Sequence, residues 1–199
     1  LASRWPRPLL NAPDRIGNLD RDKLCRLLKG VPGLEIPETL VAARVMLEGL
    51  ASGAVTLSDI AADLAFPAIV RPRGSHAGLG LAKIDDHTAL SGYLAERNEE
   101  EFFISPFVDY SGADGQFRKY RLAFVEGRPF AGHMAIAEQW NIWYLNAGMA
   151  FSADKRREEE HFMRNFDIEF AHRHRDALRA VADRVGLDYF TIDCAENKR

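Results

Sequence analysis

The sequence predicts an α+β protein, and three stretches carry that prediction. The apolar run at 66–70, FPAIV, is typical of a buried strand. Residues 117–125 and 128–137 flank a Glu-Gly pair, which predicts a β-hairpin. The stretch 171–185 has apolar residues at helical spacing, and Gly186 follows it where helices commonly end. Strands and helices of this length together indicate a mixed fold.

Composition is that of a globular protein of one or two domains, with 199 residues, 47% hydrophobic and 28% charged. The net charge of −3 gives no basic field, so we expect no nucleic-acid partner. Cys25 and Cys194 lack a Cys-x-x-Cys spacing and indicate a reducing compartment. No apolar run approaches the ~18 residues of a membrane helix, and no signal-peptide layout opens the chain. We therefore expect a cytoplasmic protein without a membrane partner, and the start at Leu1 suggests a processed product or a fragment.

The first third of the chain predicts short elements. Residues 1–19 are rich in Pro and Asn and predict an extended segment with turns. Asp20 is a good N-cap for a short helix that ends near Gly30. Further along, the pattern predicts a strand at 33–37, a helix over 40–50 and a short helix at 59–64 capped by Thr56 or Ser58.

The remaining elements follow in order. A second short strand is expected at 81–84, and a helix begins near Asp85 to Thr88. The apolar strand 102–108 is interrupted by a proline, which marks an edge, a bulge or a hinge. A solvated helix face at 154–160 and a final strand at 187–194 complete the pattern, with Asp193 projecting opposite to Phe190, Ile192 and Cys194.

The stretch between the strands at 66–70 and 81–84 is the most informative part of the sequence. It contains two cations, three glycines and two small or polar residues between them, namely Arg71, Arg73, Gly74, Ser75, His76, Gly78 and Gly80. Glycines let backbone N–H groups approach phosphate oxygens, and arginine donates two-pronged hydrogen bonds. The segment therefore indicates a polyphosphate site; the alternative is an ordinary hairpin with a glycine-rich loop. Walker and Rossmann spacings are both absent.

A second cationic cluster lies in the strand 117–125. Lys119 and Arg121 share one face of that strand and repel each other unless an anion lies between them. A nucleotide phosphate or an acyl phosphate is one candidate anion. The alternative is an exposed face paired with Glu126 or Asp114.

Other catalytic constellations are absent from the sequence pattern. The six histidines have no metal-site spacing, and there is no Gly-x-Ser-x-Gly elbow or Cys/His pair. Only His76 and His133 are candidates for a functional test, and for His133 we expect a structural histidine whose hydrogen bonds are satisfied.

With these elements placed, their order resembles the ATP-grasp superfamily, and more closely the ATP-grasp domains appended to bacterial tetratricopeptide-repeat proteins. The resemblance rests on the order and spacing of four motifs, which together cover about residues 66–195: FPAIVRPRGSHAGLGL, FFISPFVDYSGADGQFRKYRLAFVEGRPF, HMAIAEQWNIWYLNAGM and GLDYFTIDCAE. It implies an ATP-grasp-like α+β fold with two lobes around a nucleotide cleft. The implied boundaries are a preceding segment at 1–65, an N-lobe at 66–107 and a C-lobe at 108–199.

The resemblance also implies roles for particular residues. Arg71 stands where many members have a lysine on the α/β phosphates, and the loop from Gly74 to Gly80 would cover the triphosphate. Residues 103–107, including Ser105 and Phe107, would form the hinge beside the adenine. Lys119 and Arg121 would face the phosphates or the acceptor, and Asp193 would be the first Mg²⁺ ligand. An acceptor pocket is expected near 139–146, whose aromatic residues are alternatively plain core.

The implied reaction is that of an ATP- and Mg²⁺-dependent carboxylate–amine ligase acting on small molecules through an acyl phosphate. The family's further metal ligands, a Glu and an Asn on a later strand, have no match, since Glu196-Asn197 follows Asp193 too closely. We therefore expect a truncated C-lobe. The alternatives are a non-catalytic binding or scaffolding module and a small-molecule phosphotransferase on the same fold; a homodimer is also possible.

Overall fold

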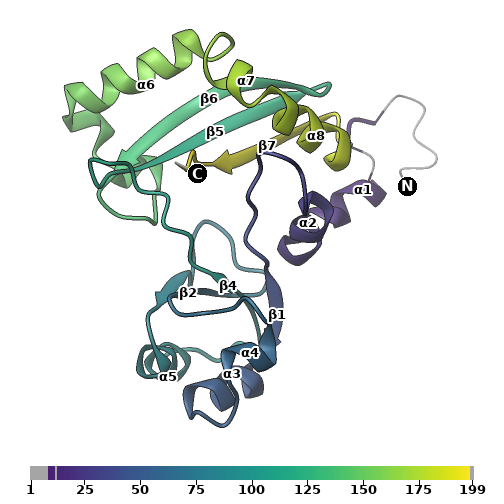
Figure 1. The fold of residues 1–199 in the computed structure, drawn as a ribbon, viewed down its shortest axis with the longest axis vertical. Helices are drawn as coiled ribbons and strands as arrows, with labels where there is room; N and C mark the ends of the chain where they lie inside the picture. The colour runs from purple at the N-terminus through teal and green to yellow at the C-terminus, as the bar shows by residue number, and fades with distance from the viewer. Residues whose placement is uncertain (1–8, 12, 198–199) are drawn as a thin grey trace. The chain divides into compact units, whose positions relative to one another are not determined.

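The computed structural model describes residues 9–11 and 13–197 (Figure 1). The chain divides into two compact units. We name them by their sheets: the N-sheet unit contains residues 20–26 and 36–108, and the C-sheet unit contains 27–35, the residues from 109 onward and the described residues before 20. Each unit has its own sheet and its own covering helices, so each is described by itself.

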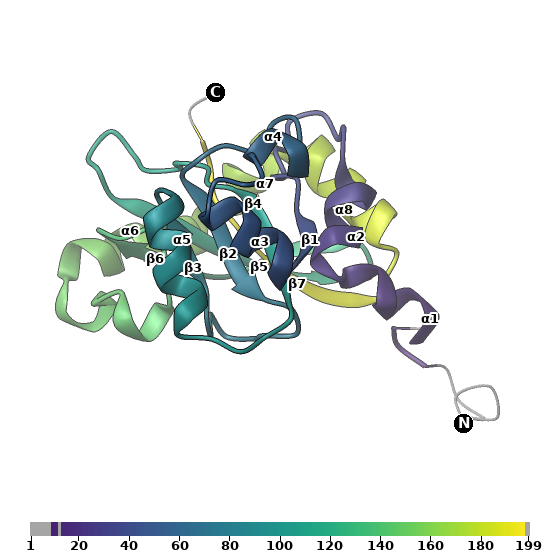
Figure 2. The same ribbon diagram turned by 90° about the horizontal axis from the view of Figure 1, so that it is seen from below.

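The N-sheet unit is built on a four-stranded antiparallel sheet in the order β1-β4-β2-β3. Its helices α3 and α5 lie side by side against one face of that sheet (Figure 2). The core between them contains Leu47, Leu50, Val70, Leu90 and Phe102, all fully buried. The elements are β1 (Leu40–Ala43), α3 (Arg44–Ala51), α4 (Leu57–Ile60), β2 (Ala68–Pro72), β3 (Ala82–Ile84), α5 (His87–Ala95) and β4 (Glu101–Pro106).

Side-chain caps mark the start of two helices of this unit, α4 and α5. Thr56 and Asp59 form a capping box at the start of α4, with Asp59 N donating to Thr56 Oγ1 and Thr56 N donating to Asp59 Oδ2. Asp86 caps α5 by accepting from Ala89 N at 2.8 Å. The predicted helix starts near Thr56 and Asp85 to Thr88 are therefore confirmed.

Three predictions in the first third of the chain are wrong in whole or in part. The short helix expected at 59–64 is α4 at Leu57–Ile60, and residues 61–64 are not helical. Residues 33–37 form no strand, and Leu40–Ala43 is not helical but pairs antiparallel with β4. The apolar spacing around residue 40 fits either structure. Pairing with Phe102 and Phe103 decides for the strand, since a partner strand distant in sequence outweighs local propensity.

The C-sheet unit has a three-stranded antiparallel sheet in the order β6-β5-β7. Helices α6, α7 and α8 lie on one side of it (Figure 1). The predicted hairpin is confirmed as β5 (Phe117–Val125) and β6 (Arg128–Ala137), and the last strand as β7 (Tyr189–Cys194). The other elements are α1 (Pro13–Ile16), the 3₁₀ turn Gly17–Leu19, α2 (Arg21–Leu28, shared between the units), two 3₁₀ turns η3 (Tyr144–Asn146) and η4 (Met149–Phe151), α6 (Ala153–Asn165), α7 (Phe170–Arg173) and α8 (Arg175–Val185).

Several predictions for the ends of the chain are resolved here. The helix after Asp20 is confirmed as α2. The helix expected over 171–185 is interrupted at His174, so it forms α7 and α8. Part of the segment expected to be extended is helical in α1, while residues 1–8 and 12 lie outside the described residues. None of the described helices combines the length and apolarity needed to cross a membrane.

Alternation along β5 separates two faces of the C-sheet. Tyr120, Leu122 and Phe124 are buried, whereas Lys119 and Arg121 are on the opposite face and more exposed. On β7, Phe190 is buried and Asp193 lies on the opposite, more exposed face of the strand, as predicted. The register between β5 and β6 shifts at Arg121, where a Cβ on Gly132 would lie 2.9 Å from the Arg121 carbonyl oxygen. The sheet thus has one face for packing and one charged face.

Candidate functional site

In the N-sheet unit, Arg71 is bound to the glycine loop, residues 74–80, that follows its strand. Its Nε and Nη2 donate to Ser75 Oγ at 3.1 and 2.9 Å, and Nη2 also donates to the Ser75 carbonyl at 2.5 Å. Ser75 Oγ in turn donates to the Pro72 carbonyl at 2.8 Å. Partial burial lowers the pKa of Arg71, with a further contribution from the charge of Arg21, but the guanidinium stays protonated. A fixed cation therefore stands at the base of the loop.

The far end of the loop is held by a residue that the sequence pattern did not single out. Tyr93 in α5 donates its hydroxyl hydrogen to the Gly80 carbonyl at 2.7 Å. Burial raises the pKa of Tyr93 to about 12, and the Arg97 guanidinium lies 4.5 Å from the centre of its ring. Gly80 has φ +67°, and a Cβ there would meet Pro72 Cδ at 2.7 Å, so glycine is required. A hydroxyl contact of this kind cannot be assigned from a helical pattern alone.

The face of the N-sheet that carries Arg71 also carries a further predicted residue, Ser105, and a lysine that the sequence analysis did not single out, Lys83. Ile69, next but one to Arg71 on β2, pairs with both Ser105 and Lys83, so all four side chains share that face. Lys83 Nζ lies 5.2 Å from the centre of the Phe107 ring and 2.6 Å from Asp85 Oδ1. The structure therefore adds Lys83 to the cationic residues of this face.

Other predicted residues of the glycine segment face solvent. Arg73 pairs with Glu101 at 2.8 Å, and both side chains are about half exposed. His76 is exposed, and Gly74 and Gly78 have φ of +79° and +76°. These positions leave the middle of the loop open on its outer side.

On the charged face of the C-sheet, Lys119, Arg121 and Asp193 form a triad. Arg121 donates to both Asp193 oxygens at 2.7 and 2.9 Å, and Lys119 Nζ lies 3.3 Å from Oδ2. Burial alone would raise the pKa of Asp193, but the Arg121 hydrogen bonds and both positive charges outweigh it and lower that pKa. The anion between the two cations is thus a carboxylate of the chain itself, and the pairing with Glu126 or Asp114 considered from the sequence is wrong.

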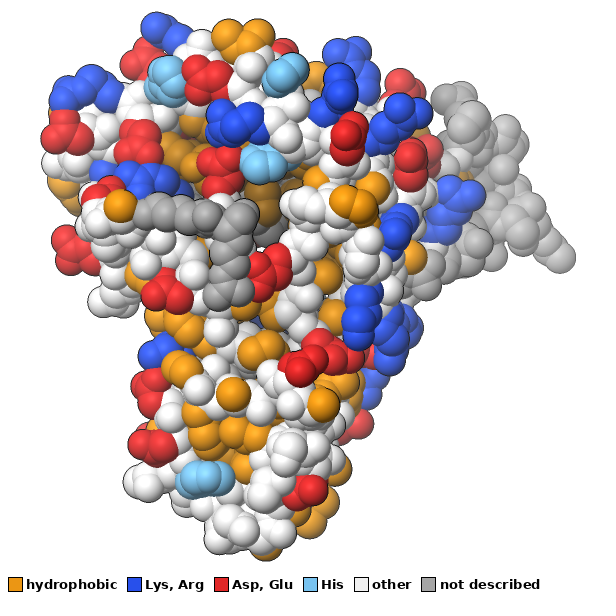
Figure 3. Space-filling view, viewed as in Figure 1, with side chains coloured by type: hydrophobic (Ala, Val, Ile, Leu, Met, Phe, Trp, Pro, Cys, Tyr) orange, Lys and Arg blue, Asp and Glu red, His pale blue; other side chains and the backbone are white. Residues whose placement is uncertain are grey.

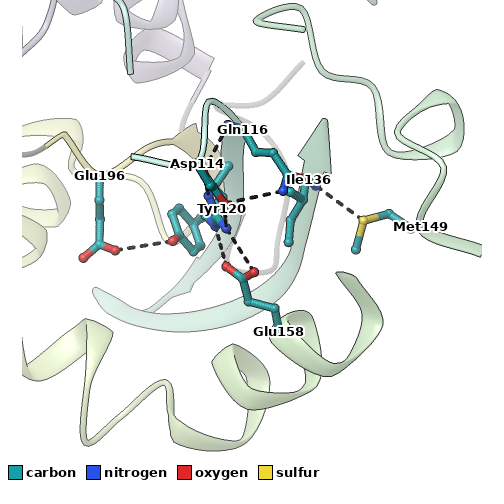
Figure 4. Close-up of polar contacts among 8 residues, drawn as sticks. Asp114, Gln116, Tyr120, Ile136, Met149, Glu158 and Glu196 are labelled. Atoms are coloured by element: carbon teal, nitrogen blue, oxygen red, sulfur yellow. Dashed lines mark hydrogen bonds and ion pairs between the residues drawn. The ribbon is translucent and has the colours of Figure 1, made fainter. Parts of the chain in front are cut away.

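Asp114 instead belongs to a cluster around Arg118, part of which is shown in Figure 4. Arg118 Nη2 donates to Asp114 Oδ2 at 2.8 Å and to Glu158 Oε2 at 3.1 Å. Both partners raise the pKa of Arg118, the Glu158 hydrogen bond most. This cluster ties β5 to α6 and lies away from the triad, since Arg118 and Arg121 are on opposite faces of the strand.

The residues present do not complete a magnesium site. Asp193 is engaged by two cations, and the described residues contain no group of three metal-ligating side chains. Glu196 is directed to the other face, where it accepts hydrogen bonds from Tyr120, Arg173 and His174. The sequence inference that Glu196 does not act with Asp193 agrees with this geometry.

The segment predicted to wall the acceptor pocket, residues 139–146, lies against the charged face. Lys119 Nζ donates to the Ile142 carbonyl at 2.6 Å, and the Tyr110 hydroxyl donates to the Trp140 carbonyl. The ring of Tyr144 packs edge-on against His133, with ring centres 4.8 Å apart. Trp143 is 61% exposed, so the alternative of plain core does not hold for that residue.

His133 is the unsatisfied member of this neighbourhood. It pairs with Arg121 across β5 and β6, and its Nδ1 is buried with no hydrogen-bond partner in the described structure. Burial, and next the charge of Arg121, lowers the pKa of His133. The expectation of a satisfied structural histidine is therefore wrong, and a neutral imidazole stands beside the triad at neutral pH.

Comparisons with known proteins support the fold. No family model and no curated protein matches the sequence. Among solved structures, N5-carboxyaminoimidazole synthase from Aspergillus clavatus has a TM-score of 0.56 at 10% identity, over 99% of this chain and 45% of that one. A RimK domain ATP-grasp protein from Sphaerobacter thermophilus gives 0.53 at 16% identity, over 97% and 59%. The D-Ala:D-Ser ligase VanG from Enterococcus faecalis gives 0.50 at 14%, over 90% and 49%.

These neighbours are ATP-grasp ligases, and the chain spans roughly half to three fifths of the length of those it matches. Structural similarity at such low sequence identity supports the fold but not the activity. The mixed helices and antiparallel sheets of the two units confirm the predicted α+β class. The chain has the ATP-grasp fold.

Proposed function

We propose that this chain is the ATP-binding part of a ligase that joins a carboxylate to an amine through an acyl phosphate. The observation that carries the proposal is Arg71, a partly buried guanidinium fixed by Ser75 at the base of a glycine loop in a chain with the ATP-grasp fold. A cation so held needs no large reorganisation to receive a phosphate.

Each unit supplies a distinct part of the proposed chemistry. In the N-sheet unit, Arg71 and Lys83 would bind phosphate oxygens, the loop from Gly74 to Gly80 would cover them, and Ser105 to Phe107 would contact the adenine. In the C-sheet unit, Lys119 and Arg121 would offset charge on the transferred phosphoryl group and on the acceptor carboxylate. Arg73, Ser75 and His76 would contribute to the loop that closes over the nucleotide.

The proposed reaction proceeds in two balanced steps. The acceptor carboxylate attacks the γ-phosphorus of ATP, which forms an acyl phosphate and releases ADP. The amine then attacks the acyl carbon, phosphate leaves with the bonding electrons, and the nitrogen loses a proton. Neutral His133 beside Arg121 is suitably placed to interact with the acceptor side of this reaction.

The acceptor is proposed as a small molecule or a peptide. PsnB, an ATP-grasp ligase with a TM-score of 0.52 at 12% identity to this chain over 95% of it and 48% of PsnB, is described in complex with a precursor peptide and AMPPNP. VanG is described as a D-Ala:D-Ser ligase. A tetratricopeptide-repeat partner domain, a homodimer and a cytoplasmic location remain predictions from the sequence.

Magnesium is the usual companion of ATP, and hard oxygen ligands suit it. Asp193 would be the first ligand on this chain. Because Arg121 and Lys119 already hold that carboxylate, the described residues do not fit a complete site, and no step is assigned to the metal.

This mismatch favours one alternative, a binding module that keeps the fold and does no ligase chemistry. The two functions differ in a simple observation. A ligase consumes ATP when its acceptors are present, whereas a binding module shows a nucleotide-dependent stability change without turnover.

A thermal-shift titration with ATP, ADP and a non-hydrolysable analogue, each with and without Mg²⁺, tests the proposal. Ligand at about 100 times its Kd should stabilise the native state by about 2.7 kcal/mol. Arg71→Ala should abolish the shift, whereas Arg26→Ala, an exposed arginine paired with Asp22 in α2, should retain it. Equal shifts in both variants would place the nucleotide elsewhere, and no shift in the parent chain would refute the proposed site.

A further inference from the structure

A cavity lies on the helix-covered side of the C-sheet, opposite the face that carries Lys119 and Arg121. Its volume is about 150 Å³, and β5, β6, α6, α7 and the residues after β7 contribute to its lining. Figure 3 shows a hollow on this unit with apolar atoms at its floor and charged or histidine side chains around its mouth. A cavity of about this volume can hold a molecule the size of benzene, so the space suits a ligand of roughly five or six non-hydrogen atoms.

Three aromatic rings form the apolar wall of this cavity. The rings of Tyr120, Phe162 and Phe170 are in mutual contact, with centres 4.9, 4.9 and 5.6 Å apart. Each residue is at most 8% exposed, so the rings are held in place by packing. Fixed aromatic faces attract cations and also bury short alkyl chains.

The charged groups around the rings are predominantly acidic. Three carboxylates, Glu158, Glu169 and Glu196, line the cavity against one arginine, Arg173. Two of the carboxylates already have partners within the protein. Glu158 forms an ion pair with Arg118, and Glu196 accepts hydrogen bonds from Arg173, His174 and Tyr120.

Of these three carboxylates, Glu169 has the most remaining capacity to accept hydrogen bonds. Its Oε2 lies 3.1 Å from His161 Nε2. An ionised carboxylate has about four acceptor positions, so Glu169 can accept further hydrogen bonds. A ligand with a charged donor at one end and a short apolar body would match Glu169 and the rings together.

We propose that this cavity binds a small primary alkylammonium, with its ammonium group at Glu169 and its alkyl chain on Tyr120, Phe162 and Phe170. The charge of the lining and the aromatic wall select a cation over a neutral or anionic molecule of the same shape. The site is separate from the proposed nucleotide site, since Tyr120 and Lys119 are on opposite faces of β5.

Methyl-labelled methionine NMR tests the proposal on the full chain. The four methionines give four signals, and Met134 lines the cavity whereas Met46 lies in the N-sheet unit. Titration with n-butylammonium should shift the Met134 signal in a saturable way and leave Met46 unchanged. The matched probes n-butanol and n-butyrate should bind much more weakly, since they lack the positive charge.

A pair of variants completes the test. Glu169→Gln should weaken n-butylammonium binding by roughly tenfold, as expected for the loss of one hydrogen bond between charged groups. Glu160→Gln, at an exposed position of α6 paired with Arg164, is the matched control and should bind normally. An unmoved Met134 signal, or equal binding of the alcohol, would overturn the proposal in the parent chain even if a variant fails to fold.

Discussion

Arg121 on β5 donates two hydrogen bonds to Asp193 on β7, Nε to Oδ1 at 2.7 Å and Nη2 to Oδ2 at 2.9 Å, across directly paired positions of neighbouring strands. The residue predicted to hold a metal is thus bound by a residue predicted to contact phosphate. Any anion that binds Arg121, or any cation that binds Asp193, must compete with this pair. The pair therefore links stability of the C-sheet to occupancy of its charged face.

The first prediction concerns this pair. Asp193→Asn should lower the free energy of unfolding at neutral pH by about 1 kcal/mol, a value kept small because both side chains are partly exposed. The pKa of Asp193 is depressed in the folded state, so its contribution is present above the ordinary value of 3.8 and is lost as pH falls through the lower folded value.

Urea unfolding over a pH series measures the effect. Asp183→Asn, an exposed position in α8 at 4.0 Å from Arg179, is the matched control and should change stability little. A pH-independent difference between the parent chain and Asp193→Asn would contradict the role of the ion pair.

The second prediction concerns the glycine loop. Gly80→Ala should destabilise the protein by about 2 kcal/mol, since alanine is strained at φ +67° and its Cβ would lie 2.7 Å from Pro72 Cδ. Gly78→Ala, at φ +76° with no atom within 4 Å of its Cβ, should cost only about 1 kcal/mol. Equal losses in urea unfolding would show that the contact with Pro72 is unimportant.

The third prediction concerns Tyr93. Tyr93→Phe removes the hydrogen bond to the Gly80 carbonyl and should cost about 1 kcal/mol at neutral pH. Because burial raises the pKa of Tyr93 to about 12, its contribution is fully present below the ordinary value of 10 and is lost as pH rises toward 12.

Ultraviolet difference absorbance of tyrosine ionisation checks this directly. The variant should lack one late-titrating phenol of the parent chain. An unchanged number of late-titrating phenols in Tyr93→Phe would refute the assignment.

The fourth prediction rests on the proposed function. Ser75→Ala removes the hydroxyl that accepts from Arg71 and should weaken ATP binding by roughly three- to tenfold, less than Arg71→Ala, because the guanidinium stays and keeps its hydrogen bond to the backbone carbonyl of residue 75. Isothermal titration calorimetry with ATP measures the order of affinities. Ser91→Ala, at an exposed position of α5, is the control, and a loss equal to that of Ser75→Ala would contradict the proposal.

Patterns with short-range causes were predictable from the sequence. The hairpin of β5 and β6, the helix begun by Asp86 and the opposition of Asp193 to Phe190 all follow from local turn chemistry, capping or strand alternation. The grouping of Arg71 with the glycine loop was also predictable, since Ser75 is only four residues away.

The relationships that involve distant segments were decided only by the tertiary structure. Strand Leu40–Ala43 needs β4 as its partner, Tyr93 reaches Gly80 from the next helix, and Asp193 lies between Lys119 and Arg121 because β7 pairs with β5. The sequence by itself determined the α+β class, the basic glycine loop and the two faces of β5 and β7, because these depend on period and local conformation. Which anion neutralises which cation depends on long-range strand pairing, and no local pattern encodes it.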